Sequence, residues 1–285
     1  RERIEQAAAI LKSCTLCPRQ CGVDRTAGET GFCSAGSHAR VASYAPHFGE
    51  EPQLVGTHGS GTVFFSHCNL KCCFCQNYDI SIQGTGIDAA PGQLASVMLE
   101  LQDRGCHNIN LVTPTHVVPQ FLEELDRAAD HGLNLPIVYN TSGYDRVPVL
   151  KLLDGIVDIY MPDIKFFDPD LAEQACQAAD YPDAVRAAVK EMHRQVGDLV
   201  VDEKGVAVRG LLVRHLVLPE DMAGTEAVMA FIKDEISPDT YINVMSQYRP
   251  AGDAHKVRRL ARAVTPDEFR AALQTAQSYG LKLVR

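Results

Sequence analysis

The sequence predicts an α/β fold, a partial (βα)6 barrel of parallel strands preceded by a cysteine-rich extension. Six short apolar runs recur along the chain, helix-like stretches separate most of them, and eight of the ten cysteines fall in two clusters before the second run. Strands that alternate with helices favour parallel βα units with right-handed crossovers. Six such strands fit a partial barrel better than the eight strands of a closed one.

The elements follow in order along the chain. Residues 1–13 place apolar side chains at helical spacing and predict a short amphipathic helix, whereas residues 34–61, rich in Gly, His, Pro and Glu, predict an irregular loop. The predicted strands are 62–66, 108–113, 136–141, 156–161, 211–218 and 240–245, with a last short strand at 281–284. The predicted helices are 91–105, 118–132, 182–197, 225–236 and 266–280. We divide the chain into an N-terminal metal-binding segment with its Gly-rich loop, residues 1–61, and the barrel, residues 62–285.

Composition excludes several classes of function. A net charge of -9 and the absence of any run of five Lys or Arg residues give no electrostatic support to nucleic-acid binding. The apolar runs are far shorter than the roughly 20 residues that span a bilayer, so no membrane is expected. No secretory signal is visible, and we therefore expect the protein in the cytoplasm. Because a disulfide framework is typical of small secreted domains, the cysteines indicate metal chemistry.

Cys68, Cys72 and Cys75 have C-x3-C-x2-C spacing in a loop that follows the first predicted strand. Three thiolates on one loop can bind three irons of a 4Fe–4S cluster and leave the fourth iron without a protein ligand. A structural zinc ion would need a fourth ligand, and none lies at finger-like spacing downstream. Cys73 is off the spacing and is expected to be a wall residue, and the isolated Cys106 and Cys176 are expected to be packing residues or inert thiols.

A second set of cysteines, Cys14, Cys17, Cys21 and Cys33, has C-x2-C-x3-C-x11-C spacing near the N-terminus. Four thiols can complete a tetrahedral zinc site or bind all four irons of an auxiliary cluster, and the spacing does not decide between them. We expect a metal of one kind or the other here.

Polar residues gather at the ends of the later predicted strands. In parallel βα folds these ends share one edge, which is where active sites lie. An unpaired charge within an apolar strand is costly, so Arg214 is expected to find a partner, either a ligand carboxylate or a structural ion pair. His215 should face away from Arg214, because strand side chains alternate. The residues expected at this edge are Thr113, Thr115, His116, Asn140, Thr141, Ser142, Met161, Asp163, Lys165, Arg214, Ser246, Gln247 and Tyr248.

The stretch HCNLKCCFCQNYDIS, with Phe74 just before the last motif cysteine, and the preceding GEEPQLVGTHGSGTVFFS resemble the radical SAM superfamily. Within it, they resemble the pyruvate formate-lyase activating-enzyme-like branch of unassigned substrate. The resemblance implies a 4Fe–4S cluster on Cys68, Cys72 and Cys75 that cleaves S-adenosylmethionine (SAM) to a 5′-deoxyadenosyl radical, which abstracts hydrogen from a substrate. It also implies SAM contacts from Phe74, beside the adenine, and from Asn77, Thr113, Thr115, Asn140, Thr141, Asp163, Lys165, Arg214 and Gln247.

The sequence departs from this family's pattern in two places. Val112 to His116 read VTPTH where relatives carry a GGE-like stretch, so backbone carbonyls and the Thr115 hydroxyl are expected to replace a carboxylate. The resemblance also implies a monovalent cation beside the SAM carboxylate, at turns that here contain Asn140 and Asp163. Asn140 replaces an aspartate and removes one negative charge from that site.

Three functions remain open from the sequence. The first is an activating enzyme that makes a glycyl radical on a partner protein, with electrons from a reductant such as flavodoxin or ferredoxin. The second is radical SAM modification of a small molecule or a peptide. The third is a non-catalytic iron–sulfur or zinc protein that transfers electrons or senses redox state. The sequence identifies neither the substrate nor the oligomeric state.

Overall fold

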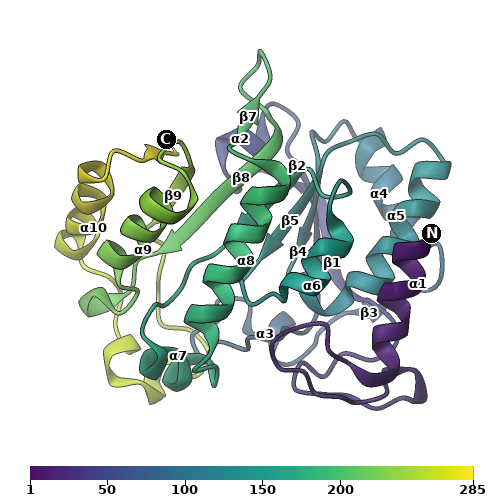
Figure 1. The fold of residues 1–285 in the computed structure, drawn as a ribbon, viewed down its shortest axis with the longest axis horizontal. Helices are drawn as coiled ribbons and strands as arrows, with labels where there is room; N and C mark the ends of the chain where they lie inside the picture. Colours follow the sequence, from purple (N-terminus) through teal and green to yellow (C-terminus); the bar gives the residue numbers. More distant parts are fainter. Residues whose placement is uncertain (285) are drawn as a thin grey trace.

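A ten-stranded sheet runs through the centre of the molecule in the computed structural model, which describes residues 1–284 (Figure 1). The strand order is β10-β9-β8-β6-β5-β4-β2-β1-β3, and β7 pairs with β8 off this path. The strands are β1 (Arg40–His47), β2 (Ser60–Phe65), β3 (Ile87–Asp88), β4 (Ile109–Val112), β5 (Ile137–Thr141), β6 (Ile159–Pro162), β7 (Val200–Val201), β8 (Ala207–Leu216), β9 (Tyr241–Met245) and β10 (Lys282–Leu283).

The predicted parallel strands are confirmed. Strands β2, β4, β5, β6, β8 and β9 pair in parallel in that order, and β10 adds a further parallel strand beside β9. Along one row, Val63 pairs with Leu111, Leu111 with Tyr139, Tyr139 with Tyr160 and Tyr160 with Leu211. Parallel strands are covered on both faces and therefore consist of nearly continuous apolar residues, which is why the sequence reveals them.

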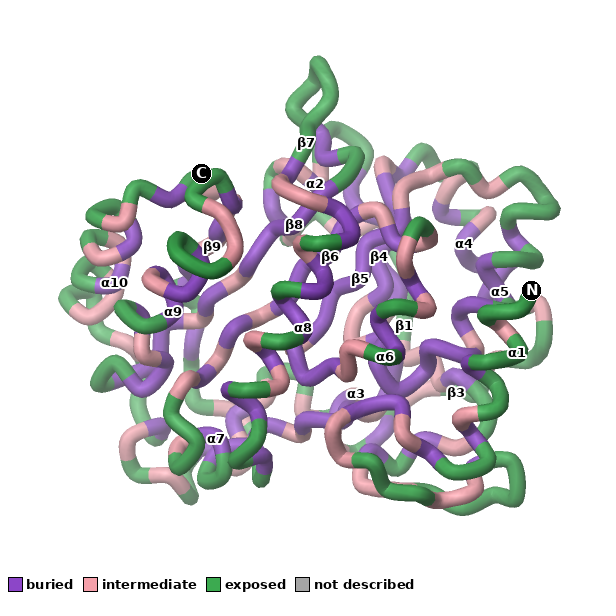
Figure 2. The backbone as a smooth tube through the Cα atoms, in the orientation of Figure 1, coloured by how far each residue is buried: buried purple, intermediate pink, exposed green. Residues whose placement is uncertain are grey.

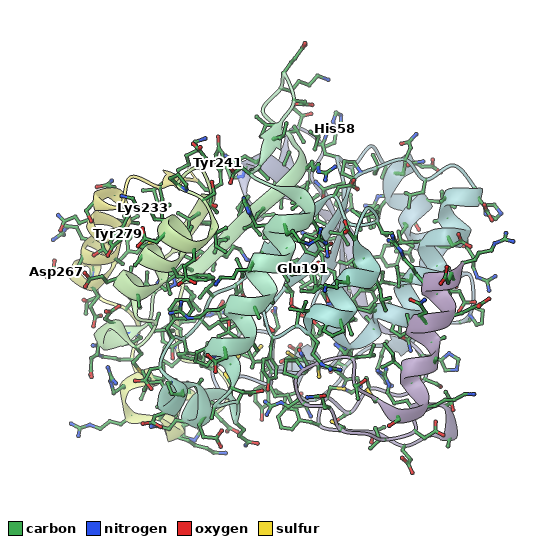
Figure 3. All side chains as sticks on the ribbon, in the orientation of Figure 1. His58, Glu191, Lys233, Tyr241, Asp267 and Tyr279 are labelled. Atoms are coloured by element: carbon green, nitrogen blue, oxygen red, sulfur yellow. The ribbon has the colours of Figure 1, made fainter. Side chains whose placement is uncertain are left out.

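Helices lie outside the curved sheet, with α1 beside α5 at one end and α10 beside α9 at the other (Figure 1). The predicted helices are all present, although Ile232–Ile236 continues α9 as a π-helix. A cation–π interaction connects the segment after α9 to the end of α10, since Lys233 Nζ lies 5.8 Å from the centroid of the Tyr279 ring (Figure 3). The helices are α1 (Glu2–Ala9), α2 (Pro52–Val55), α3 (Tyr78–Ser81), α4 (Gln93–Asp103), α5 (Val118–Asp130), α6 (Val147–Leu150), α7 (Pro169–Cys176), α8 (Tyr181–Val196), α9 (Thr225–Phe231) and α10 (Pro266–Ser278).

The prediction that residues 34–61 form only an irregular loop is wrong in one part. Strand β1 lies within this range and pairs antiparallel with β2 along most of its length. Its side chains are exposed or half-buried, so the strand lacks the apolar run by which the others were recognised, and it contains Pro46. The division of the chain at residue 61 stays a prediction, but β1 shows that part of the N-terminal segment extends the barrel sheet.

Two more elements were missed in the sequence. Strand β8 begins at Ala207, before its predicted start, and forms a small hairpin with β7 that projects from the molecule as an exposed loop (Figure 2). The Asp202 carboxylate shapes its turn by accepting from the backbone N–H groups of Lys204 and Val206. Helix α7 is the other, and Asp168 caps its first turn.

The core follows the central strands, which are buried along most of their length, whereas the outer helix faces are exposed (Figure 2). Burial of these apolar side chains is the main force that holds the sheet and helices together. Among residues 1–284, no helix is both long and apolar enough to cross a membrane.

Buried arginines attach the N-terminal segment to the carboxyl edge of the parallel strands. Arg19 donates to the carbonyl oxygens of Asn69 (3.1 Å) and Cys176 (2.7 Å). Arg25, only 1% exposed, donates to the carbonyl oxygens of Gly36 and His116, both at 2.8 Å. Since a buried donor without a partner is costly, these bonds fix the position of the segment.

His215 is buried on the helix side of β8, opposite Arg214, as strand alternation predicts. Its Nδ1 donates to the Ile164 carbonyl (3.1 Å), so its Nε2 accepts from the Thr225 hydroxyl (3.0 Å) in the neutral ring. Burial lowers the pKa of His215 to about 4, below the ordinary value of 6.5. The unfolded chain therefore binds a proton at a higher pH than the folded chain does.

This difference predicts that acid weakens the fold. The stabilising effect of neutral His215 is fully present above pH 6.5 and is lost as the pH falls toward 4, which amounts to about 2 kcal/mol of unfolding free energy between pH 7 and 5. Urea unfolding of the wild type and of His215→Asn at several pH values measures it. The variant should have a shallower pH slope, whereas His131→Asn, on the surface, should keep the wild-type slope. Equal slopes in wild type and His215→Asn would contradict the prediction.

Candidate active site

A cavity of about 250 Å³ lies where the parallel strands end. Its lining comes from the ends of β2, β4, β5, β6, β8 and β9 and from the loops that follow these strands. The predicted site residues that line it are Cys68, Cys72, Cys75, Phe74, Asn77, Thr113, Asn140, Thr141, Asp163, Lys165, Arg214 and Gln247. Of the residues predicted to bind cofactors in the barrel, Thr115 alone is not among the lining residues.

The loop that carries Cys68, Cys72 and Cys75 leaves β2 through residues in unusual backbone conformations. His67 has φ 71° and Lys71 has φ 52°, and these left-handed residues turn the chain back over the cavity. Backbone hydrogen bonds then tie Cys73 to distant segments, because its N–H donates to Ala175 O (2.8 Å) and its carbonyl accepts from Asp253 N (2.7 Å). The loop is thus held by the rest of the fold and not by its own sequence alone.

The three loop thiols lie in different electrostatic surroundings. Burial raises the pKa of Cys68 to about 12 and also raises the pKa of Cys75, although the latter receives a hydrogen bond from Ser81 Oγ (3.1 Å). The pKa of Cys72 is lowered, first by a hydrogen bond from the Cys176 thiol and also by Lys165. A buried thiolate needs a positive partner, and metal ions supply it, so this donor set fits an iron–sulfur cluster.

Cys176 was expected from the sequence to be a packing residue or an inert thiol. It is buried at the end of α7, and its thiol hydrogen-bonds Cys72. The sequence contained no signal for this contact, since 104 positions of chain lie between two residues that only the fold brings together.

A network of ion pairs joins the ends of β5, β6 and β8 inside the cavity. Asp163 accepts from Arg214 Nε at Oδ1 (2.7 Å) and from Lys165 Nζ at Oδ2 (2.6 Å), and Arg214 Nη2 donates to Asn140 Oδ1 (2.6 Å). Burial by itself raises the pKa of Asp163, but Arg214 and Lys165 outweigh it, and the net pKa is lowered. The carboxylate is ionised at neutral pH and pairs with both cations.

Glu50 adds to this network and was not predicted. Its carboxylate lies 3.6 Å from Arg214 Nη1 and pairs with His47, while the neighbouring Glu51 accepts from Asn243 Nδ2 (2.9 Å). Burial raises the pKa of Glu50, and Arg214 opposes that shift. Glu50 and Glu51 belong to the stretch GEEP, but nothing in the sequence indicated that this stretch contacts β8, which lies far downstream.

Thr115 takes part in a buried hydrogen-bond cluster beneath the cavity. Its hydroxyl donates to Asp145 Oδ1 (2.7 Å), which also accepts from Tyr139, while Asp145 Oδ2 accepts from Thr141 (2.6 Å). The cluster fixes Thr141, which lines the cavity, to the ends of β4 and β5. Thr113, with φ 58°, faces the cavity in its place. The contact of Thr115 with SAM stays a prediction.

The aromatic wall of the cavity is formed by Phe74, which packs edge-on against Phe166 and Tyr248 with centroids 6.0 and 5.8 Å apart. Gln247 and Gln76 come from opposite sides of the opening, and Gln76 Nε2 donates to the Gln247 carbonyl (2.8 Å). A flat apolar ring beside polar groups is suited to a purine.

The N-terminal cysteines converge although they are spread over twenty residues of chain. Cys14, Cys17 and Cys33 are buried and Cys21 is exposed. Electrostatic interactions with Cys33 and Cys14 contribute to the raised pKa of Cys17, after the larger effect of burial. A Cβ at Gly31 would lie 2.7 Å from Cys21 Sγ, so this position accepts only glycine without a shift.

Among the described residues, neither set of cysteines has the arrangement of ligands around a single metal ion. Among residues 1–284, no three His, Cys, Asp or Glu side chains are placed so that they could hold one metal ion. Cysteines that bind a cubane each bind a different iron and therefore lie farther apart than the ligands of one ion.

Comparison with known proteins agrees with this geometry. Residues 62–203 match the Radical SAM superfamily. The chain is 33% identical over 292 aligned positions to "Uncharacterized protein MJ0674" of Methanocaldococcus jannaschii, which covers 99% of this chain and 79% of that protein. A radical SAM methyltransferase from Sphaerobacter thermophilus has a similar fold, with a TM-score of 0.54 and 15% identity over 78% of this chain. This chain covers 64% of the methyltransferase.

The fold and the cavity are those of an enzyme class that cleaves SAM with an iron–sulfur cluster. The chain belongs to the radical SAM superfamily. When bound, the cluster supplies the electron that breaks a sulfur–carbon bond of SAM and so starts radical chemistry. The protein's own part is to hold the cluster on three cysteines, to orient SAM in the cavity and to exclude water.

The cysteine loop gives a direct test of the cluster assignment. After anaerobic reconstitution, Cys72→Ala should lose most of the iron and of the visible absorbance that belongs to the loop cluster, because one of its three ligands is gone. Cys106→Ala removes another buried cysteine and should keep wild-type values. Iron and sulfide analysis with absorbance spectra measures both variants. A Cys72→Ala protein with the full wild-type cluster content would contradict the assignment.

Proposed function

We propose that this protein is a radical SAM enzyme that abstracts a hydrogen atom from its substrate and that its target is a glycine residue of a partner protein. The first part rests on one observation: the three motif cysteines and the polar strand ends line the same cavity. The second part rests on the resemblance to activating enzymes. A reductant such as flavodoxin or ferredoxin would supply electrons, and the competing target is a small molecule or a peptide.

In this proposal, different residues of the cavity bind different parts of SAM. Lys165 and Arg214, which line the cavity, are proposed to bind the SAM carboxylate. The Phe74 ring packs against the adenine of SAM, and the hydroxyl of Thr141 and the amide of Asn77 face the polar middle part of SAM. Cys68, Cys72 and Cys75 leave one iron open for the amino and carboxylate groups of SAM.

We propose that this site does not use the monovalent cation that the resemblance implies. Asn140 Oδ1 is bonded to Arg214, and both carboxylate oxygens of Asp163 are bonded to Arg214 and Lys165. A guanidinium and an ammonium therefore stand where a cation would need free oxygens. We propose that SAM binds here without one.

The N-terminal cysteines are proposed to hold an auxiliary metal centre. Four thiols that lie near one another can hold either zinc or an iron–sulfur cluster. Arg19 donates to the carbonyl oxygens of Asn69 and Leu70 in the neighbouring cysteine loop, so hydrogen bonds connect the two cysteine loops. A protein that only transfers electrons through these centres is the remaining alternative.

The enzymatic proposal predicts SAM cleavage by cluster-loaded protein. After reduction with dithionite without oxygen, chromatography should show 5′-deoxyadenosine and methionine in equal amounts, and Cys72→Ala should form neither. Deuterium transfer into deoxyadenosine from a labelled partner protein, and not from labelled small molecules, would support the glycine target. A protein with full cluster content that leaves SAM intact would overturn the enzymatic proposal and favour electron transfer.

The ion-pair network predicts independence from alkali cations. The rate of SAM cleavage should be the same in potassium, sodium and tetramethylammonium buffers of equal ionic strength. Arg214→Gln frees oxygens of Asn140 and Asp163, so its SAM affinity should fall and should be partly restored by potassium or sodium. A wild-type enzyme that loses activity in tetramethylammonium would contradict this reading.

A further inference from the structure

A second cavity, of about 200 Å³, lies beside the catalytic cavity, and His67 lines both of them. Its floor is formed by Ser66 and His116 at the ends of β2 and β4, and its side by Arg40 of β1 and Asp88 of β3. Residues 34–38, which follow the N-terminal cysteines, form its roof. A molecule bound here would lie next to His67, which also lines the SAM cavity.

The roof of this second cavity is fixed by three side chains from other parts of the fold. Arg25 donates to the carbonyl oxygens of Gly36 and His116 and so joins roof to floor. Lys71 Nζ donates to Ser34 Oγ (3.0 Å), and Gln120 Nε2 donates to the Ser37 carbonyl (2.7 Å). A cavity held open in this way is a preformed site, as small-molecule sites usually are.

Arg40 and Asp88, which line the second cavity, form an ion pair (3.2 Å), and the cations Lys71 and Arg25 bond to the lining residues Ser34 and His116. The charged groups that act on His67 are the cations Arg40, Lys71 and Arg25 and one carboxylate, Asp88. The described hydrogen bonds of the buried Arg25 all go to carbonyl oxygens, which leave its charge uncompensated. The surroundings therefore favour an anionic ligand.

His116 shows what else the ligand must carry. Its Nε2 lies 2.8 Å from the Ser66 carbonyl, which only accepts, so Nε2 carries the hydrogen. Burial lowers the pKa of His116 to about 3, which keeps the ring neutral. Nδ1 is then an acceptor, and among residues 1–284 it has no donor. Arg40 Nε, in the same wall, is a buried donor that lacks an acceptor. Each such group costs free energy until a ligand or water meets it.

We propose that the second cavity binds the part of the substrate that carries an N–H group next to a carboxylate, as in an acylated amino acid. The N–H donates to His116 Nδ1, and the carboxylate faces Arg40, whose buried Nε lacks an acceptor. The cavity is smaller than a usual drug-sized site and is suited to one such residue-sized group. The inference rests on the proposed function, because it places this group beside the cavity where the hydrogen is abstracted.

Three small probes separate the features of the ligand. N-acetylglycine has both the N–H and the carboxylate, acetate lacks the N–H, and N-acetylglycinamide lacks the charge. Calorimetry with cluster-loaded protein and SAM, without oxygen or reductant, should show N-acetylglycine binding about tenfold tighter than either of the others, since one hydrogen bond or ion contact in such a site is worth about 1.4 kcal/mol.

Two variants assign the contacts. His116→Gln keeps a donor for the Ser66 carbonyl but loses the Nδ1 acceptor, so N-acetylglycine should bind no better than acetate. Arg40→Gln removes the guanidinium from a partly exposed position, so N-acetylglycine should bind no better than N-acetylglycinamide. Arg127→Lys, on the exposed face of α5, is the control and should bind as the wild type does. Cluster absorbance and circular dichroism show whether each variant is folded.

The outcomes are distinct from those of the proposed function, because binding is measured without SAM cleavage. Equal affinity for all three probes, or no binding of N-acetylglycine, would overturn the inference and leave the cavity to water. If His116→Gln fails to fold, the Arg40→Gln variant alone tests the inference. An Arg40→Gln protein that still prefers N-acetylglycine to N-acetylglycinamide as strongly as the wild type does would overturn the inference as well. SAM cleavage without probe binding would leave the proposed function standing and remove this site.

Discussion

Parallel strands all end at the same edge of a sheet, and the rest of this structure depends on that constraint. Strands β2, β4, β5, β6, β8 and β9 are parallel, so residues from distant parts of the chain meet in one cavity. Arg214 then connects the ends of β5, β6 and β8 through Asn140 and Asp163. In a buried site such charges are tolerated only as a connected set, and the network forms a rigid polar wall of the cavity.

The N-terminal segment completes this edge. Arg19 bonds the cysteine loop after β2, and Arg25 bonds the turn after β4, so the N-terminal segment is fixed beside the loops that form the active cavity. Both cysteine sets and the second cavity lie along the contact between segment and barrel. The irregular backbone of the segment is bonded partly by the barrel, since Arg146 donates to the Thr15 carbonyl and Gln120 to the Ser37 carbonyl, and partly by its own Asp24, which caps a turn.

The sequence predicted most of the fold and the first half of the site. Short apolar runs revealed the parallel strands, and the C-x3-C-x2-C motif directly follows the run that forms β2. Strand β1 was missed because its side chains are exposed or half-buried and it has no apolar run. The contacts of Glu50 and Cys176 were missed because they depend on packing between segments far apart in sequence.

The central claim is that the cluster on the cysteine loop has an open iron to which SAM binds within this cavity. Electron paramagnetic resonance of the reduced cluster, recorded with and without SAM, tests it most directly. We predict that SAM changes the g values of the loop cluster in the wild type and that the altered spectrum is absent in Cys72→Ala. An identical spectrum with and without saturating SAM would contradict the claim.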